Sequence, residues 1–215
     1  MIDLHTHTLL SYGELLPTEL ARRAQEKGYK VIGITDHVDS SNIDFVIPRV
    51  ISVCNDINKN WKIRAIPGVE ITHMPIELIK STVKFVRSKG IKLVLVHGET
   101  IVEPVIKGTN KEALLSGISV LTHPGLISIK DAKLAASRNI YLEITARKGH
   151  SLTNGHVVKI ARIAGARLIL NTDAHTPENL ISKEEAEKIL IGAGLDKKEI
   201  SQVFKNSEEL AARLA

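Results

Sequence analysis

Cysteine, long apolar runs and aromatic residues are all scarce in this sequence of 215 residues. A single cysteine, Cys54, excludes an internal disulfide framework and is typical of a reducing cytoplasm, where we expect the protein to act. Because Cys54 falls in a predicted helix, we expect a buried packing residue and no nucleophile. No apolar run approaches the roughly 18 residues of a membrane-spanning helix, so we expect no membrane partner. Met1 leads directly into a strand that carries Asp3 and His5, which is unlike a signal peptide.

Aromatic residues make up only 3% of the chain, so the stacking platforms that bind single-stranded nucleic acid are scarce. The net charge of +5 favours anionic partners in general, without singling out nucleic acid. Apolar residues reach 43% and charged residues 25%, which are ordinary globular values. The length then predicts one domain over residues 1–215 with a sizeable core.

Short apolar segments alternate with amphipathic ones along the whole chain. The predicted strands cover residues 2–5, 31–35, 63–69, 91–96, 119–122, 140–144 and 167–171. The predicted helices cover residues 17–27, 45–58, 76–88, 111–115, 129–138, 156–164, 183–193, 197–204 and 207–214. This order predicts parallel strands with helices outside, in either an open sheet or a closed barrel.

Potential metal ligands stand at the end of every predicted strand. His5 and His7 are two residues apart on a strand, so both side chains point to one face. The full set is His5 and His7, Asp36 and His37, Glu70, His97, His123, Glu143, and Asp173 and His175. Six of the nine histidines fall at strand ends, more than a random scatter would place there. Because only a closed ring brings all seven strand ends together, we predict an α/β fold, a distorted (β/α)7 TIM-like barrel.

The number and type of these ligands predict more than one metal ion. Without Asp36 and Glu143, which are expected to support the others, eight nitrogen and oxygen ligands remain. They exceed the roughly four to six that one ion takes, and they match two or three divalent ions with a bridging carboxylate. Imidazole and carboxylate without thiolate suit Zn, Mn or Fe. Two ions about 3.5–4 Å apart can clamp the oxygens of a phosphoryl transfer and lower the pKa of a bound water.

Six short motifs in a fixed order resemble the PHP (polymerase and histidinol phosphatase) family of metal-dependent phosphoesterases. They are Asp3-Leu4-His5-Thr6-His7-Thr8, Ile34-Thr35-Asp36-His37, Gly68-Val69-Glu70, Val96-His97-Gly98, Thr122-His123-Pro124-Gly125 and Thr172-Asp173-Ala174-His175. The resemblance spans nearly the whole chain and implies a distorted seven-stranded barrel with a trinuclear metal site.

The resemblance also implies which residues hold each ion. It implies that His5, His7, Glu70 and Asp173 hold the first ion, that Glu70 bridges to a second on His97 and His123, and that His37 and His175 hold a third. Glu70 and Asp173 are then the residues expected to act in catalysis, with a metal-bound water.

The chain departs from the family after the His-X-His motif. The family usually supplies Asp or His five or six positions past the second histidine, where this chain has Tyr12 and Gly13. Tyr12 is an unusual ligand, and Glu14 is the other candidate if the loop is shifted. Both two and three ions therefore remain open.

Further polar residues near the strand ends are candidates for binding substrate or supporting the ligands. Arg147 and Lys148 follow the sixth strand, where a guanidinium can hold phosphate oxygens in a bidentate pair. Asp36 and Glu143 are expected to orient the ligands by accepting hydrogen bonds. His73 and His156 are assigned to structural positions, and His150 to an ordinary loop position, with support of a ligand or proton donation as its alternative role.

These expectations define one main function and two alternatives. The main hypothesis is hydrolysis of a phosphate monoester on a small metabolite, similar to histidinol phosphatase, by a water that the metal activates. A phosphodiesterase or nuclease acting on nucleotides or nucleic acid is the first alternative. A metal-binding subunit without catalysis is the second. The sequence does not specify the oligomeric state.

Overall fold

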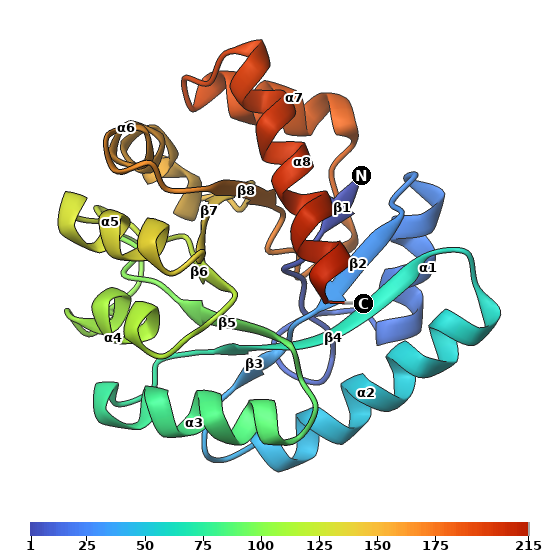
Figure 1. Ribbon diagram of the computed structural model, residues 1–215. Coiled ribbons are helices and arrows are strands. Elements are labelled where there is room, and N and C mark those ends of the chain that lie inside the picture. The colour runs from blue at the N-terminus through green and yellow to red at the C-terminus, as the bar shows by residue number, and fades with distance from the viewer. Residues whose placement is uncertain (215) are drawn as a thin grey trace.

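A parallel sheet curls around the centre of the molecule, with helices outside it, in the computed structural model, which describes residues 1–214 (Figure 1). The strands are β1 (Ile2–Asp3), β2 (Val31–Ile34), β3 (His37–Val38), β4 (Arg64–Ile71), β5 (Leu93–His97), β6 (Val120–Thr122), β7 (Tyr141–Thr145) and β8 (Leu168–Asn171). Their spatial order is β1-β2-β4-β5-β6-β7-β8, with β3 paired to β4, and every pair is parallel. The predicted α/β barrel is confirmed.

The barrel closes where the chain leaves β1 and β8. Thr6 and Ala174 form a parallel bridge, and the His7 amide donates to the Ala174 carbonyl at 2.9 Å. The Asp173 amide donates to the His5 carbonyl at 3.0 Å. The first and last ligand motifs of the sequence are therefore held together by backbone hydrogen bonds.

The second predicted strand is interrupted, which gives eight strand segments in place of the seven strands expected. The Thr35 amide donates to the Thr6 carbonyl at 2.9 Å, and the Thr6 amide donates to Thr35 Oγ1 at 3.1 Å. Thr35 and the next residue therefore leave the β4 ladder, which resumes at β3 with His37 opposite Glu70. This break lets Asp36 and His37 turn toward the ligand end of the barrel.

The helices follow the predicted positions closely up to the last one. They are α1 (Pro17–Glu26), α2 (Ile43–Asn60), α3 (Ile76–Ser88), α4 (Thr109–Leu115), α5 (Ile129–Ser137), α6 (Asn154–Ala164), α7 (Lys183–Gly192) and α8 (Lys197–Arg213), with short 3₁₀ helices η1 (His150–Thr153) and η2 (Pro177–Asn179). Cys54 is fully buried in α2, as expected, and burial raises the pKa of its thiol to about 12. Within residues 1–214, no helix is long and apolar enough to cross a membrane.

The prediction of two C-terminal helices was wrong, because α8 runs through residues 205 and 206 without a break. Asn206 is a residue that usually ends or begins a helix. Here its side-chain amide donates to the Leu168 carbonyl at 2.8 Å, and its Oδ1 accepts from Arg167 at 2.9 Å. These contacts with the β8 end of the barrel satisfy the side chain inside the helix.

The barrel interior is divided into an apolar layer and a polar layer. Alternate residues of a strand share a face, so Leu93 and Leu95 of β5 point inward together with His97. The apolar interior group is Leu4, Ile66, Leu93, Leu95, Val120, Tyr141 and Ile169, and Leu210 and Ala211 of α8 pack against it. The polar layer lies at the opposite ends of the same strands, so the carboxyl ends of β4, β5, β7 and β8 carry the site.

Candidate metal centre

Four predicted ligands converge at the centre of the polar layer. His5 Nε2 lies 3.0 Å from His7 Nε2 and 3.3 Å from Glu70 Oε1. Asp173 Oδ1 lies 3.1 Å from His7 Nε2 and 3.5 Å from His5 Nε2. All four side chains are buried. The structure therefore brings together the four residues that the resemblance implies for the first ion.

The hydrogen bonding of His5 leaves a lone pair that faces this centre. Glu143, also fully buried, accepts a hydrogen bond from His5 Nδ1 at 2.8 Å. In a neutral ring the proton is then on Nδ1, so Nε2 presents a lone pair to His7, Glu70 and Asp173. A carboxylate behind a histidine in this way is the usual support of a metal-binding imidazole. The residues present therefore fit a divalent cation, and Glu143 lies behind His5, on the side away from the centre.

The electrostatics of the cluster also favour a cation. Burial opposes a charged His5 ring, but Glu143, Glu70 and Asp173 raise its pKa well above the ordinary value, so an ion bound at Nε2 would displace a proton from that atom. Burial and the neighbouring His37 lower the pKa of His7 well below its ordinary value. Burial alone would raise the pKa of Glu70 and of Asp173, but the surrounding imidazoles lower both. The two carboxylates therefore stay ionised and attract positive charge to this point.

The second pair of predicted ligands lies on the β5 and β6 side of Glu70. His123 Nε2 is 3.6 Å from Glu70 Oε1 and 3.7 Å from Asp173 Oδ2. The rings of His97 and His123 are 4.4 Å apart. Thr122 Oγ1 donates to Glu70 Oε1 at 2.6 Å and fixes that carboxylate between the two groups.

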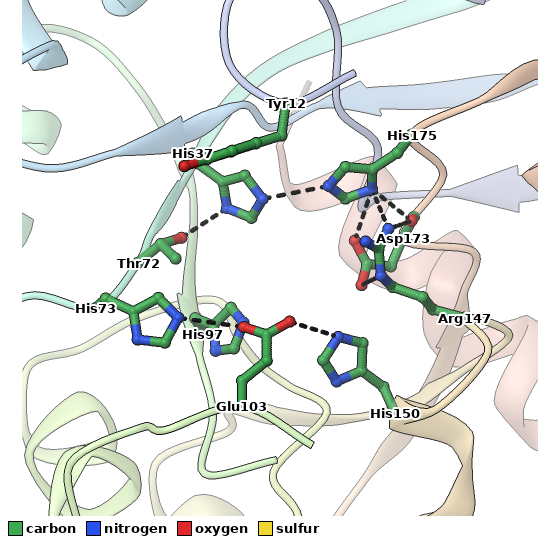
Figure 2. A pocket seen from close by; sticks show the side chains of 10 residues that line it. All are labelled: Tyr12, His37, Thr72, His73, His97, Glu103, Arg147, His150, Asp173 and His175. Atoms are coloured by element: carbon green, nitrogen blue, oxygen red, sulfur yellow. Dashed lines mark hydrogen bonds and ion pairs between the residues drawn. The ribbon is translucent and has the colours of Figure 1, made fainter. Parts of the chain in front are cut away.

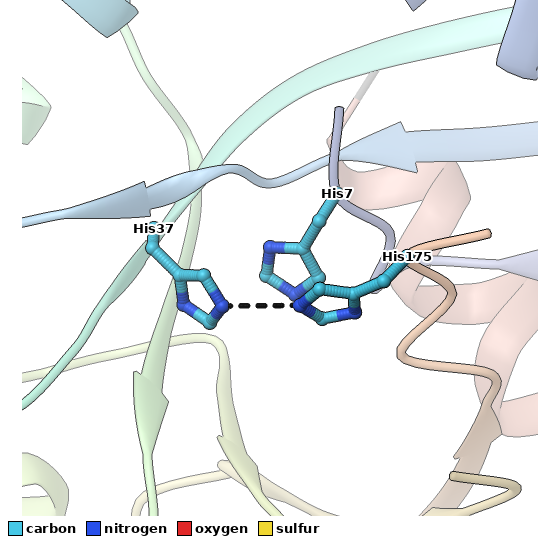
Figure 3. Close-up of side chains that lie close together, drawn as sticks. All are labelled: His7, His37 and His175. Atoms are coloured by element: carbon cyan, nitrogen blue, oxygen red, sulfur yellow. Dashed lines mark hydrogen bonds between the residues drawn. The ribbon is translucent and has the colours of Figure 1, made fainter. Parts of the chain in front are cut away.

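The third group consists of His7, His37 and His175 (Figure 3). The Nε2 atoms of His37 and His175 are 3.3 Å apart, and the His7 ring lies 4.0 Å from that of His37 and 4.2 Å from that of His175. Burial and the Arg147 cation lower the pKa of His175 to about 4, so its ring is neutral and can ligate at neutral pH. Tyr12 is 80% exposed, with its ring edge-on to His37 at 5.5 Å.

The loop that departs from the family is closed tightly under this third group. Asp36 accepts hydrogen bonds from the Thr8 amide and hydroxyl, both at 2.8 Å, and from Ser11 Oγ at 2.6 Å. Asp36 thus holds the loop, and the histidines are not its direct partners. A Cβ atom on Gly13 would overlap the His7 carbonyl, so this loop excludes a side chain at that position. Glu14 is exposed and does not line the cavity.

A cavity of about 390 Å³ opens above the three groups (Figure 2). Arg147 lines one wall, where its Nη1 donates to the Asp173 carbonyl at 3.1 Å and contacts His175 Nδ1. Its guanidinium is therefore anchored beside the ligands and partly open to the cavity. Lys148 is exposed and lies outside the lining, so of the two expected phosphate-binding residues only Arg147 reaches the site.

Four residues of the cavity wall were not assigned to the site from the sequence: Thr72, His73, Glu103 and His150. Glu103 lies in the irregular segment between β5 and α4, and its carboxylate faces both histidines (Figure 2). Sequence reasoning assigned His73 and His150 to structural or loop positions and overlooked Glu103. The sequence feature that could have indicated Glu103 is its place in the segment that follows β5, the strand that ends in the candidate ligand His97. His156 does have a structural contact, to the Ile127 carbonyl at 2.9 Å.

Backbone conformation supports a functional role for this end of the barrel. Within residues 1–214 four non-glycine residues have positive φ, and three of them, His73, His123 and Asp173, belong to the site. Such conformations cost free energy and cluster where function requires a particular side-chain direction.

Sequence comparison identifies relatives over most of the chain. The family model described as PHP domain matches residues 3–111. The protein named "Uncharacterized protein MJ1295" of Methanocaldococcus jannaschii is 44% identical over 204 residues, which cover 94% of each chain. A protein of Shewanella pealeana named "Probable phosphatase" is 29% identical, with coverage of 88% of this chain and 83% of the relative.

Structure comparison identifies the same kind of barrel. A chain in the structure of an archaeal ribonuclease P with mature tRNA superposes with a TM-score of 0.77 at 16% identity, covering 100% of this chain and 91% of that one. A Listeria monocytogenes protein assigned as histidinol phosphatase hisK has a TM-score of 0.63 at 11% identity, covering 86% and 99%. At these identities the likeness concerns the fold.

Proposed function

Because this chain belongs to the PHP domain family, we propose that it is a metal-dependent phosphatase that hydrolyses the phosphate monoester of a small metabolite. One observation carries the proposal: Nε2 of the buried His5 imidazole faces His7, Glu70 and Asp173 at 3.0–3.5 Å. Relatives named as phosphatases support it.

The chain's own residues would hold two or three divalent ions, of which Zn, Mn and Fe suit the imidazole and carboxylate donors. Such ions, when bound, activate water and neutralise charge on a phosphoryl group. Glu70 and Asp173 supply the negative charge that holds cations at the centre, and His5 is fixed by Glu143 in the tautomer that ligates. His97, His123, His37 and His175 extend the ligand set toward the cavity.

Arg147 is the residue best placed to bind the phosphate. Its Nη1 donates to the Asp173 carbonyl and its Nε lies 3.5 Å from Asp173 Oδ2, while the side chain still lines the cavity, so its Nη2 can donate to a phosphate oxygen. The cavity volume of about 390 Å³ lies near the lower end for small-molecule sites, which favours a small phosphorylated metabolite. The resemblance to histidinol phosphatases points to the same substrate class.

The proposal is tested with purified protein stripped of metal and reloaded with Mn, Zn, Fe or Mg. We expect turnover of p-nitrophenyl phosphate and of one or more compounds in a panel of phosphorylated metabolites, with loss of turnover after chelation. Faster turnover of bis-p-nitrophenyl phosphate or of single-stranded DNA would replace the monoesterase by a phosphodiesterase. Absence of turnover with every metal and substrate would leave a metal-binding subunit and contradict the proposal.

A further inference from the structure

Ligand-type side chains also gather at the outer rim of the cavity, outside the set that the family motifs supply. Glu103 Oε2 lies 3.0 Å from His97 Nε2 and 3.1 Å from His73 Nε2 (Figure 2). The three ligand atoms lie within 4.8 Å of one another. Two of the three residues, His73 and Glu103, have no role in the function proposed above.

The hydrogen bonding of His97 directs its Nε2 at Glu103. Its Nδ1 lies 3.2 Å from the Gly98 carbonyl, which only accepts hydrogen bonds, so Nδ1 carries a proton. Nε2 lies 3.0 Å from an ionised carboxylate, which also only accepts, so a positive charge must lie between the two atoms. A second proton on Nε2 supplies that charge, and a divalent ion can replace the proton. His97 is buried, with a side chain only 3% exposed.

Glu103 is held in this position from its other side. Thr100 Oγ1 lies 2.7 Å from His150 Nδ1 and can donate to it, so that Nε2 of His150 carries the proton. That Nε2 lies 3.3 Å from Glu103 Oε1. His150 therefore orients the carboxylate by a hydrogen bond to one oxygen and leaves the other oxygen for His73 and His97, as partners of metal-binding carboxylates do.

His73 reaches the cluster through an uncommon backbone conformation. It has a φ of 49°, in the left-handed region that costs a non-glycine residue free energy. The residue follows β4, the strand that carries Glu70, and its ring lies 4.9 Å from the ring of His97. The backbone adopts this less favourable conformation and thereby places the His73 imidazole at the rim of the cavity.

We propose that His73 and Glu103 are further ligands of the divalent transition-metal ion that His97 Nε2 binds, with His150 as the residue that positions Glu103. Two imidazoles and one carboxylate suit Fe, Mn or Zn and leave positions open for water or substrate. The side chains of His73 and Glu103 are 41% and 35% exposed, so this ion exchanges more readily than one at the buried centre. The inference rests on the proposed function in one respect, that the barrel binds such ions.

Counting bound ions in the full-length protein without substrate tests the site. We would dialyse wild type, Glu103→Gln, His73→Gln and the matched control Glu208→Gln against Mn²⁺ or Zn²⁺ and measure metal by mass spectrometry. Glu208 is exposed on α8, the helix that packs against the apolar layer of the barrel, so its substitution makes the same charge change as Glu103→Gln away from the rim. Absorption of the Co²⁺-loaded forms would report the ligand set independently.

Glu103→Gln and His73→Gln should each lose one ion, or bind one ion at least about tenfold more weakly, with an altered Co²⁺ spectrum, whereas Glu208→Gln should match wild type. Unchanged ion number, affinity and spectrum in either rim variant would overturn the site. Both substituted residues are partly exposed, and circular dichroism of the metal-free proteins would verify that they fold. If wild type binds the ions but hydrolyses no phosphate ester, the proposed function is contradicted while the inference about the rim ligands stands.

Discussion

Arg147 is the residue on which substrate binding depends most directly. Arg147→Ala removes a guanidinium that can make charge-assisted hydrogen bonds, each worth about 1.5–3 kcal/mol, so kcat/KM should fall by about 10- to 100-fold. Arg147→Lys keeps the charge but loses the planar fork and should recover only part of the loss. Steady-state kinetics with the best phosphate ester measures both. Lys148→Ala is the matched control and should stay within about twofold of wild type, and an equal loss in both variants would contradict this role for Arg147.

Glu143 acts on the metal centre through His5. Glu143→Gln keeps an oxygen that accepts from His5 Nδ1 but removes the charge that makes the ring a stronger ligand. Metal affinity at the centre should fall by about 10- to 100-fold, measured by calorimetric titration of the metal-free protein. Affinity equal to that of wild type would show that the contact between Glu143 and His5 has no influence on metal binding.

The accuracy of the sequence interpretation differs among individual residues for a physical reason. His5, His97 and Asp173 stand where parallel strands end, and the shared edge of a barrel brings such positions together whatever the loops do. Glu103 stands in an irregular segment, and no periodicity distinguishes an inward-pointing glutamate there from an exposed one. His73 likewise depends on a positive φ that its residue type does not predict.

At the scale of elements, the start of α8 is stabilised by one side chain with two roles. Glu199 accepts from the Asp196 amide at 2.9 Å and pairs with Arg162 through two contacts at 2.6 and 2.7 Å. The hydrogen bond from Arg162 and that from the Asp196 amide lower the pKa of Glu199 from 4.5 to about 2. Because the pair is largely exposed, Glu199→Gln should lower the free energy of unfolding by only about 1 kcal/mol at pH 7.

The pH dependence of that difference follows from the direction of the shift. A carboxyl whose pKa is lowered in the folded state stabilises the fold above its unfolded pKa and loses that effect as the pH falls toward its folded pKa. The difference between wild type and Glu199→Gln should therefore be full above about pH 5 and shrink between pH 4.5 and 2. Urea unfolding at several pH values measures it, with Glu208→Gln on the same helix as control. A difference that grows on acidification would refute the assignment.

The helices and strands themselves were predictable because most are periodic and bounded by ordinary start and stop signals. Pro17 begins α1 and Ile76–Ser88 is helical as predicted, since in each case local propensity and the apolar face agree. The failures arose where tertiary contacts override local preference. Asn206 stays inside α8 because the Leu168 carbonyl binds it, and Thr35 leaves the β4 ladder because Thr6 binds it.

At the scale of the whole molecule, metal binding and folding stability should be linked. His5 and His7 follow β1, Glu70 lies in β4 and Asp173 follows β8, so an ion bound to them ties distant parts of the chain together. An ion present at about 100 times its Kd adds about 2.7 kcal/mol to the free energy of unfolding. Thermal unfolding with and without chelator should show a clear fall in Tm on metal removal. In His7→Ala the chelator should lower the Tm much less than in wild type. A Tm unaffected by chelation would contradict the linkage.

The barrel as a whole was predictable because the alternation of strands and helices and the ligand at each strand end allow few other arrangements. Its closure could not be derived in detail. It depends on the backbone hydrogen bonds that join His7 to Ala174 and Asp173 to His5, in segments that carry no strand pattern. The same closure brings the first and last motifs into one metal centre.

The most direct test of metal-dependent phosphate ester hydrolysis is the rate of phosphate release by Glu70→Gln relative to wild type, each loaded with the best metal. Glu70 contacts His5, His37 and His123, so its loss removes the charge shared by all parts of the centre. We predict a fall in kcat/KM of at least about 100-fold in a folded variant. Retention of wild-type, metal-dependent hydrolysis by Glu70→Gln would contradict the assignment of this centre.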